Sequence, residues 1–319
     1  MEISKFLAER MPPWVIVVAV SALMAGAPAT ASQDRSASGG ATTCAGLQVF
    51  AHRGAKSEPE NSLRAMTVAA REGWPGVELD LQSLSDGAWA LHHDPVLGLK
   101  TDVAGVRTID LSSSDWKQLR LRDRRAAITD EPGALLTEVV ASSEAGTLRL
   151  NMEIKEPFVS CPRTLTLLDA LEGRPTGSWF FTSMDPRHLS CMKSRAPDQY
   201  VGLVVVDPSS AVQKIPGAIG EMLRARQPQR FMITDAMIES FSRAISPPAG
   251  VHVELSVLEA DASLPSRLGR RGFQLMVYSK KSGGEIARSL ARHTDSSGGV
   301  LQGVILDDDW QDFCNTLSR

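Results

Sequence analysis

The sequence lacks the features that mark several large classes of protein. Its formal net charge is only −3 over 319 residues, which gives no reason to expect nucleic acid or an anionic membrane surface as a partner. The apolar run at residues 14–26 is too short for a comfortable membrane span, and no internal repeat is present. The remaining pattern, with 43% hydrophobic and 22% charged residues, is that of a globular protein with a large core.

The N-terminus has the pattern of an export signal. Lys5 and Arg10 precede the short apolar run, and Ala29-Thr30-Ala31 has the small-residue pattern of a cleavage site. We therefore predict a signal peptide at residues 1–31 and a flexible Ser/Gly/Ala-rich segment at residues 32–46. The expected protein is exported, either periplasmic or secreted, with no stable membrane insertion after cleavage. An uncleaved membrane anchor is the alternative.

From residue 47 onward, short apolar runs alternate with amphipathic stretches of helical period. This alternation is typical of a parallel sheet with helices on its faces, and about eight such units predict a (β/α)8 TIM barrel. A doubly wound open sheet is the alternative fold, but no glycine-rich phosphate loop follows the first strand. The predicted strands are residues 48–51, 77–81, 148–154, 179–182, 201–206, 231–234, 251–255, 273–278 and 303–306. One strand is surplus to the barrel, either 231–234 or 251–255. Helices are expected at 62–72, 135–145, 164–171, 211–226 and 285–293.

One long interruption separates the second predicted strand from the helix at residues 135–145. About fifty residues lie between them, far more than an ordinary βα loop contains. Ser85-Asp86-Gly87 has the composition of a tight turn, and residues 89–93 that follow it have an extended pattern. We therefore predict a small insertion at about residues 83–132, on the carboxyl-terminal face of a single domain that spans residues 47–319.

The four cysteines are an even number in an oxidising compartment, and their spacing fits no zinc site. Three pairings are possible. Cys44 lies just before the first strand and Cys314 in the last helix, which are neighbours in a closed barrel. Cys161 and Cys191 each lie near the start of successive helices. We therefore predict the disulfides Cys44–Cys314 and Cys161–Cys191.

Three acidic residues lie at the predicted carboxyl ends of adjacent strands. Glu78 and Asp80 share one face of the second strand, and Glu153 ends the third. In a barrel these ends meet at one mouth, where three carboxylates repel one another unless a cation lies between them. Oxygen ligands favour Ca²⁺ or Mg²⁺ over zinc or copper. The pattern therefore predicts a divalent metal site.

Basic groups accompany this acidic cluster in the sequence. His52 and His93 can act as a proton-transfer pair, because imidazole titrates near neutral pH. Arg53 and Lys155 place positive charge where a phosphate would develop negative charge. Asn61 is expected to cap the next helix and so to fix the loop that carries Arg53. His92 is expected not to be catalytic, because it lies on the opposite face of an extended segment from His93, and the remaining histidines, His188, His252 and His293, are expected to be structural or at the surface.

These residues stand in the order found in the glycerophosphodiester phosphodiesterase family, which the chain resembles from about residue 48 to residue 309. The resemblance implies a TIM barrel with a small insertion after the second strand, a divalent metal, and hydrolysis of glycerophosphodiesters to sn-glycerol 3-phosphate and an alcohol. The motifs that carry it are His52-Arg53-Gly54, Pro59-Glu60-Asn61, Glu78-x-Asp80, Asp86-Gly87, His93-Asp94, Glu153-Ile154-Lys155 and, less specifically, Gly303-Val304-Ile305-Leu306-Asp307.

The resemblance also implies a role for each matching residue. The metal ligands would be Glu78, Asp80 and Glu153, and the general base and acid would be His52 and His93, in an order left open. Arg53 and Lys155 would hold the phosphate, while Glu60 would orient the loop or the substrate. The late strand departs from the family, and Tyr278 would replace an aromatic wall of the substrate pocket, which leaves the preferred head group open.

Two other functions are compatible with these motifs. A lysophospholipase D-like or sphingomyelinase D-like enzyme, with a lysophospholipid substrate, uses a similar histidine pair on a related barrel. A non-catalytic binding protein is the other alternative, although none of the five candidate catalytic and metal-binding residues is missing. The sequence leaves the oligomeric state open.

Overall fold

The computed structural model describes residues 43–207, 221–222, 231–294 and 299–318, all within one compact unit, Ser38–Arg319. The predicted signal peptide at residues 1–31 lies outside the described residues, as do residues 32–42 and most of the predicted helix at 211–226. None of the helices in the described part of the chain is long and apolar enough to cross a membrane.

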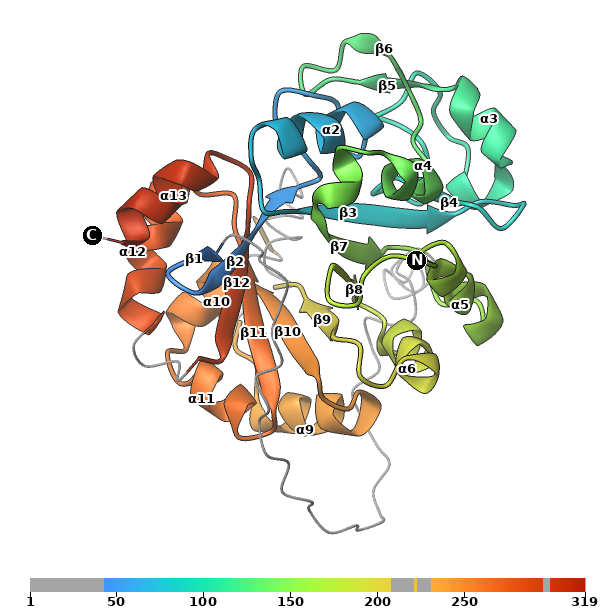
Figure 1. Ribbon diagram of the computed structural model, residues 1–319. Coiled ribbons are helices and arrows are strands. Elements are labelled where there is room, and N and C mark those ends of the chain that lie inside the picture. The colour runs from blue at the N-terminus through green and yellow to red at the C-terminus, as the bar shows by residue number, and fades with distance from the viewer. Residues whose placement is uncertain (1–42, 208–220, 223–230, 295–298, 319) are drawn as a thin grey trace. The chain divides into compact units, whose positions relative to one another are not determined.

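Eight parallel strands of the described chain form a closed barrel (Figure 1). β2 pairs with both β12 and β3, and these two pairings close the ring. The predicted (β/α)8 barrel is therefore confirmed. Its strands are β2 (Leu47–His52), β3 (Gly76–Ser83), β7 (Arg149–Ile154), β8 (Trp179–Ser183), β9 (Val201–Val205), β10 (Ala249–Glu254), β11 (Phe273–Tyr278) and β12 (Leu301–Leu306).

Helices follow most of these strands and pack against the outside of the barrel. Their starts have the expected caps: the side chain of Ser62 accepts a hydrogen bond from Ala65 N at the start of α2, and Asp185 caps α6, which begins with a proline. The helices of the barrel are α2 (Leu63–Arg71), α4 (Leu136–Ala141), η3 (Ala145–Thr147), α5 (Cys161–Asp169), α6 (Pro186–Arg195), α9 (Asp235–Ala244), α10 (Leu255–Ala260), α11 (Leu264–Gly269), α12 (Gly283–Thr294) and α13 (Trp310–Leu317).

The surplus strand of the prediction is residues 231–234, which form no strand. Ile233 is buried, and the Thr234 side chain accepts a hydrogen bond from Met237 N as the N-cap of α9. The apolar residues of this segment therefore pack as the lead-in to a helix. The other doubtful segment, at 251–255, lies within β10 except for its last residue.

The hydrophobic core of the barrel has two parts, one on each side of the barrel wall. The larger part lies between the strands and the surrounding helices. A smaller cluster fills the barrel interior and consists of Phe50, Phe180, Met276 and Ile305, with Tyr200 and Tyr278 packed against it. This apolar plug leaves the carboxyl-terminal end of the barrel for polar side chains.

The segment between β3 and α4 contains additional elements beside these strands (Figure 1). β4 (Trp89–Leu91) pairs antiparallel with β3, and β5 (Arg120–Arg122) forms a hairpin with β6 (Ile128–Pro132). η2 (Thr108–Asp110) and α3 (Ser113–Gln118) lie between β4 and β5. The insertion has its own small core around the fully buried Trp116, whose Nε1 donates to Ala134 O at 2.9 Å.

Both predicted disulfides are present. Cys44 bonds to Cys314 with a Cα–Cα distance of 5.2 Å, and Cys161 bonds to Cys191 with a distance of 5.4 Å. The prediction of a flexible segment is wrong for residues 43–46, because β1 (Thr43–Cys44) pairs with β2 and Cys44 is tied to α13.

Candidate active site

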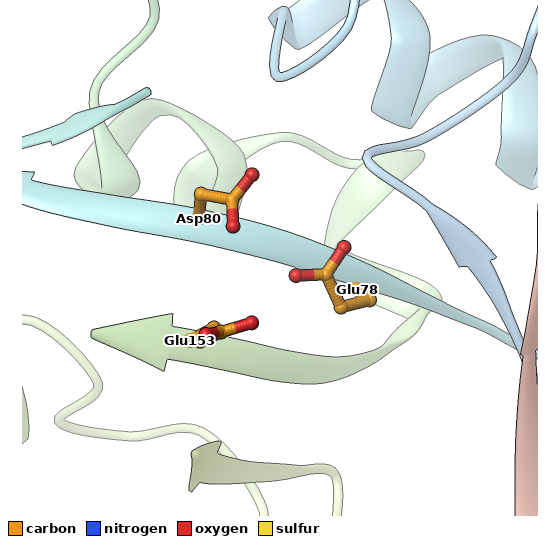
Figure 2. A group of neighbouring side chains, drawn as sticks. All are labelled: Glu78, Asp80 and Glu153. Atoms are coloured by element: carbon orange, nitrogen blue, oxygen red, sulfur yellow. The ribbon is translucent and has the colours of Figure 1, made fainter. Parts of the chain in front are cut away.

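Glu78, Asp80 and Glu153 project from two neighbouring strands into the mouth of the barrel. β3 and β7 pair in parallel with Asp80 opposite Glu153, and Glu78 lies two residues earlier on the same face of β3. All three are buried, and each offers an oxygen within 4.8 Å of the others. Figure 2 shows the carboxylates turned toward a common space between the strands. The structure therefore brings the three predicted metal ligands together.

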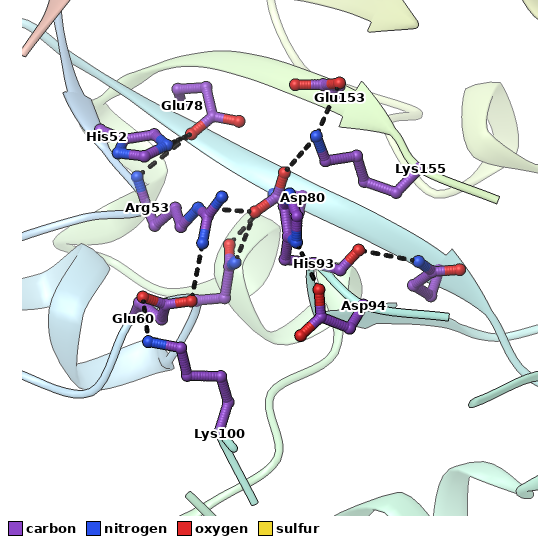
Figure 3. A network of polar contacts seen from close by, with 12 residues as sticks. His52, Arg53, Glu60, Glu78, Asp80, His93, Asp94, Lys100, Glu153 and Lys155 are labelled. Carbon is purple, nitrogen blue, oxygen red and sulfur yellow. Dashed lines mark hydrogen bonds and ion pairs between the residues drawn. The ribbon is translucent and has the colours of Figure 1, made fainter. Parts of the chain in front are cut away.

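Two cations lie against this acidic cluster (Figure 3). Lys155 Nζ is 2.8 Å from Glu153 Oε1 and 3.5 Å from Asp80 Oδ1, and Arg53 Nε is 3.0 Å from Asp80 Oδ2. Burial alone would raise the pKa of Asp80, but Lys155 and Arg53 outweigh it and hold that pKa below its usual range. Asp80 is therefore ionised at neutral pH.

Glu78 is in the opposite situation. Burial, together with the charges of Asp80 and Glu153, raises the pKa of Glu78 well above its ordinary value. The cluster has three carboxylates against two cations, so one acidic charge is left over. A buried site with only oxygen donors and a surplus of negative charge fits a hard divalent cation such as Ca²⁺ or Mg²⁺.

His52 lies at the end of β2 and is held by an acid from the last strand. His52 Nδ1 is 2.6 Å from Asp307 Oδ1, and Asp307 directly follows β12. The other ring nitrogen, Nε2, is 4.0 Å from Glu78 Oε2. Because a carboxylate bound to Nδ1 fixes the ring and its tautomer, Nε2 is left for chemistry at the acidic cluster.

His93 follows β4 and is held in the same way. Its Nδ1 lies 2.6 Å from Asp94 Oδ1, while Gln82 Nε2 donates to the His93 backbone oxygen at 3.1 Å. The neighbouring His92 is buried against Trp116. Burial lowers the pKa of His92 to about 4. Each candidate proton-transfer histidine thus has its own aspartate.

The loop after β2 turns sharply and directs Arg53 into the site. Arg53 has a left-handed φ of +60°, and Gly54 follows at +86°, where a Cβ would clash with Ala65. Arg53 Nη1 donates to Glu60 Oε1 at 2.7 Å, and Lys100 of the insertion donates to Glu60 Oε2 at 2.9 Å. Glu60 therefore holds the Arg53 side chain, and its predicted role, to orient the loop or the substrate, stays a prediction.

Asn61 has a different role from the predicted one. The N-cap of α2 is Ser62, one residue later. Asn61 instead has a left-handed φ of +58° and bonds to Asp80 twice, through Nδ2 to Asp80 Oδ2 at 2.8 Å and through Oδ1 from Asp80 N at 3.0 Å. It orients one of the candidate metal ligands.

A cavity of about 720 Å³ connects these groups. Of the predicted site residues, Asp80 alone is not part of its lining: it is 1% exposed, and its carboxylate is in contact with Arg53, Lys155 and Asn61. Tyr278 forms part of the wall, and its hydroxyl donates to Val205 O at 3.4 Å. His252, predicted to be structural or at the surface, is buried and also lines the cavity, so that prediction was incomplete. The cavity residues without a predicted role include Asp94, Lys100, Asn151, Thr182, Glu254 and Asp307.

Fold and site together have the arrangement of a (β/α)8-barrel enzyme, with polar groups gathered at the carboxyl ends of the strands. The model of the glycerophosphoryl diester phosphodiesterase family matches residues 52–291. The chain belongs to this family, as the sequence motifs indicated.

Individual relatives match over part of the chain. The glycerophosphodiester phosphodiesterase of Bacillus altitudinis is 31% identical over 121 residues, which are 36% of this chain and 48% of the relative. Glycerophosphodiester phosphodiesterase 1 of Homo sapiens is 35% identical over 116 residues, which are 34% of each protein. The chain therefore spans half or less of the length of these relatives.

Solved structures match over most of the chain. An Oleispira antarctica phosphodiesterase, in complex with the product sn-glycerol-3-phosphate, has a TM-score of 0.60 at 22% identity and covers 85% of this chain and 95% of its own. The glycerophosphodiester phosphodiesterase of Thermotoga maritima has a TM-score of 0.56 at 23% identity, and the match covers 82% of this chain and 94% of that structure's chain. At these identities the likeness shows the fold.

Proposed function

We propose that the protein hydrolyses glycerophosphodiesters to sn-glycerol 3-phosphate and an alcohol, with a divalent cation and with His52 and His93 as the proton-transfer pair. The observation that carries the proposal is the placement of two aspartate-held histidines around one buried cluster of three carboxylates. Family membership supports the reaction class, as does the product bound to the Oleispira antarctica relative. The same comparisons favour this substrate class over a lysophospholipase D-like or sphingomyelinase D-like activity.

Different residues of the site would bind the cation and the phosphate. Glu78, Asp80 and Glu153 would hold Ca²⁺ or Mg²⁺, which stabilises negative charge on the phosphate oxygens when it is bound. Arg53 and Lys155 contact these carboxylates and would bind the remaining phosphate oxygens. Glu60 keeps Arg53 in place, and Tyr278 forms a wall beside the substrate.

The histidines would move protons in two steps. In the first, one histidine takes the proton of the glycerol 2-hydroxyl as its oxygen attacks phosphorus, and the other protonates the leaving alcohol, which gives a cyclic phosphate. In the second, water adds to phosphorus with the two roles reversed, and the ring opens to sn-glycerol 3-phosphate. Asp307 and Asp94 stabilise whichever ring carries the extra proton.

Single substitutions of the histidines test the assignment. His52→Ala and His93→Ala should each reduce release of sn-glycerol 3-phosphate by at least about 10²-fold, the size of a general acid–base contribution. His293→Ala is a matched control, because His293 lies in α12 and is not part of the cavity lining. Activity equal to wild type in either cavity variant would overturn the proton-transfer roles.

We also propose that the protein is exported and that its signal peptide ends at Ala31. Two disulfides support export, because such bonds persist in oxidising compartments. The mass of the protein recovered from the periplasm or the medium tests this, with Ser32 expected at the N-terminus. A mature protein that still begins at Met1 would contradict cleavage.

A further inference from the structure

Two buried side chains deep in the cavity have polar atoms without a partner. Asn151 on β7 and His252 on β10 both line the cavity and are 0% and 1% exposed. Within the described part of the chain, Asn151 Nδ2 and His252 Nδ1 have no hydrogen-bond partner. Because an unpaired buried polar group costs free energy, two of them in one cavity point to a bound group that pairs with them.

Each side chain lies deeper in the barrel than an acidic cavity residue of its own strand. Asn151 precedes Glu153 by two residues on β7 and pairs in register with Glu78 of β3. His252 likewise precedes Glu254, another cavity residue, by two residues on β10. Side chains two residues earlier on the same face of a strand lie about 7 Å deeper in the barrel. The two residues therefore face the part of a substrate that extends inward from the phosphate.

The free atom of each side chain is a donor. Thr182 Oγ1 donates to Asn151 Oδ1 at 3.1 Å, which leaves the amide hydrogens of Asn151 unpaired. Tyr200 Oη lies 3.1 Å from His252 Nε2. Burial raises the pKa of Tyr200 above its usual range and lowers that of His252 to about 3, so the phenol keeps its proton and the imidazole is neutral. The phenol donates to Nε2, and the ring proton of His252 is on Nδ1.

Two glycines make the space for this arrangement. Gly202 on β9 pairs in register with Gly250 on β10. A Cβ at Gly202 would clash with the His252 ring and with Thr182, and a Cβ at Gly250 would clash with the Tyr200 hydroxyl. Because neither glycine has a side chain, the ring of His252 fits into the space beside Thr182. Thr182 is in turn hydrogen-bonded to Asn151.

We propose that Asn151 and His252 bind the terminal hydroxyl group of the glycerol half of the substrate. The proposal rests on the proposed function, which places a glycerophosphodiester in the cavity. A hydroxyl oxygen accepts hydrogen bonds from both kinds of N–H donor. An alkyl or quaternary ammonium head group has no such acceptor and would leave both donors unpaired, so the glycerol half is selected for this position.

Two ligands that differ by one hydroxyl group test the proposal. sn-Glycerol 3-phosphate and propane-1,2-diol 1-phosphate share the phosphate and the 2-hydroxyl, and the second lacks the terminal hydroxyl. Calorimetric binding in buffer with Ca²⁺ or Mg²⁺ should show about 10- to 100-fold tighter binding of sn-glycerol 3-phosphate by wild type. In Asn151→Leu and His252→Phe the ratio should fall below about threefold, with propanediol phosphate bound about as well as before.

Two further variants separate recognition from loss of structure. His252→Gln retains an N–H donor and should recover part of the preference. His188→Phe is the matched control, because His188 is equally buried in α6 but is not part of the cavity lining, and it should keep the wild-type ratio. If an apolar variant does not fold, the wild-type ratio and His252→Gln still decide the question.

Each failure has a distinct meaning. Equal binding of the two ligands by wild type would overturn the hydroxyl site, and so would an undiminished preference in Asn151→Leu and His252→Phe. Failure of wild type to bind either ligand would instead overturn the phosphate site of the proposed function, and the hydroxyl site with it.

Discussion

His52 Nδ1 lies 2.6 Å from Asp307 Oδ1, although 255 residues separate the two in the sequence. The contact exists because β2 and β12 are adjacent in the closed barrel, with Leu306 opposite Ala51 in the register. The first and last strands of the barrel therefore bring these two side chains together at the candidate active site. Burial would raise the pKa of Asp307, but its contact with His52 holds that pKa below the usual range, so Asp307 is a carboxylate at neutral pH.

Asp307→Asn should lower kcat by about 10²-fold or more, because an amide neither fixes the required His52 tautomer nor stabilises the protonated ring. KM should change little. Asp308→Asn is a matched control on the next residue, whose side chain pairs with Lys56 at the surface, and it should stay within about twofold of wild type. Steady-state kinetics on the two variants tests the pair. An Asp307→Asn enzyme as fast as wild type would contradict the role of the contact.

The leaving group can decide which histidine is the general acid. A p-nitrophenyl ester of glycerol phosphate needs no protonation when its phenolate leaves, so loss of the acid should matter much less for this substrate than for glycerophosphocholine. Of His52→Ala and His93→Ala, the variant that lacks the general acid should therefore regain activity on the p-nitrophenyl ester. Its loss of rate on this substrate, relative to glycerophosphocholine, should shrink by at least about 10-fold more than that of the other variant. Equal losses in both variants on both substrates would contradict a division into acid and base.

Glu78→Gln should stabilise the metal-free protein against unfolding. It should also abolish the rise in Tm that the metal causes in wild type. The pKa of Glu78 is raised in the folded state, so its ionisation weakens folding as the pH rises above about 4.3, its unfolded value. The glutamine lacks this cost, and the expected gain in Tm is about 2–6 °C at pH 7.5 in chelator. Added Ca²⁺ or Mg²⁺ should raise the Tm of wild type but not of the variant. A lower Tm of the variant in chelator would contradict the repulsion inferred here.

His252 should make the protein sensitive to acid. Its folded pKa of about 3 lies below the unfolded value of about 6.5, so below pH 6.5 the unfolded chain binds a proton that the folded chain excludes. Stability contributed by the neutral ring is present above pH 6.5 and is lost as the pH falls toward 3. Between pH 7.5 and 5, wild type should lose about 2 kcal/mol more stability than His252→Phe. Urea unfolding at both pH values measures this, and identical losses would contradict the low pKa.

The sequence predicts most of the barrel and most of the site because both depend on local patterns. Continuous apolar strands locate the barrel strands within a few residues, and the candidate ligands Glu78, Asp80 and Glu153 lie at strand ends that the pattern places at one mouth. The segment at residues 231–234 shows the limit of this reasoning, because apolar content alone does not distinguish a short strand from the lead-in to a helix.

The contacts that sequence reasoning misses are those between distant segments. The partner of His52, Asp307, stands in a recognised motif, but only barrel closure shows what it contacts. Asn61 has the residue type of a helix cap, and its left-handed backbone instead turns the amide onto Asp80. His252 carries no local signal, since its place in the cavity depends on glycines of two paired strands.

The central claim is that a cation held by Glu78, Asp80 and Glu153 is required for hydrolysis of glycerophosphodiesters. The most direct measurement is the release of sn-glycerol 3-phosphate from glycerophosphocholine by the purified mature protein after exhaustive chelation, before and after Ca²⁺ or Mg²⁺ is added back. We predict no release above background after chelation and full recovery with one of the two ions. Full activity in the chelated protein would contradict the account.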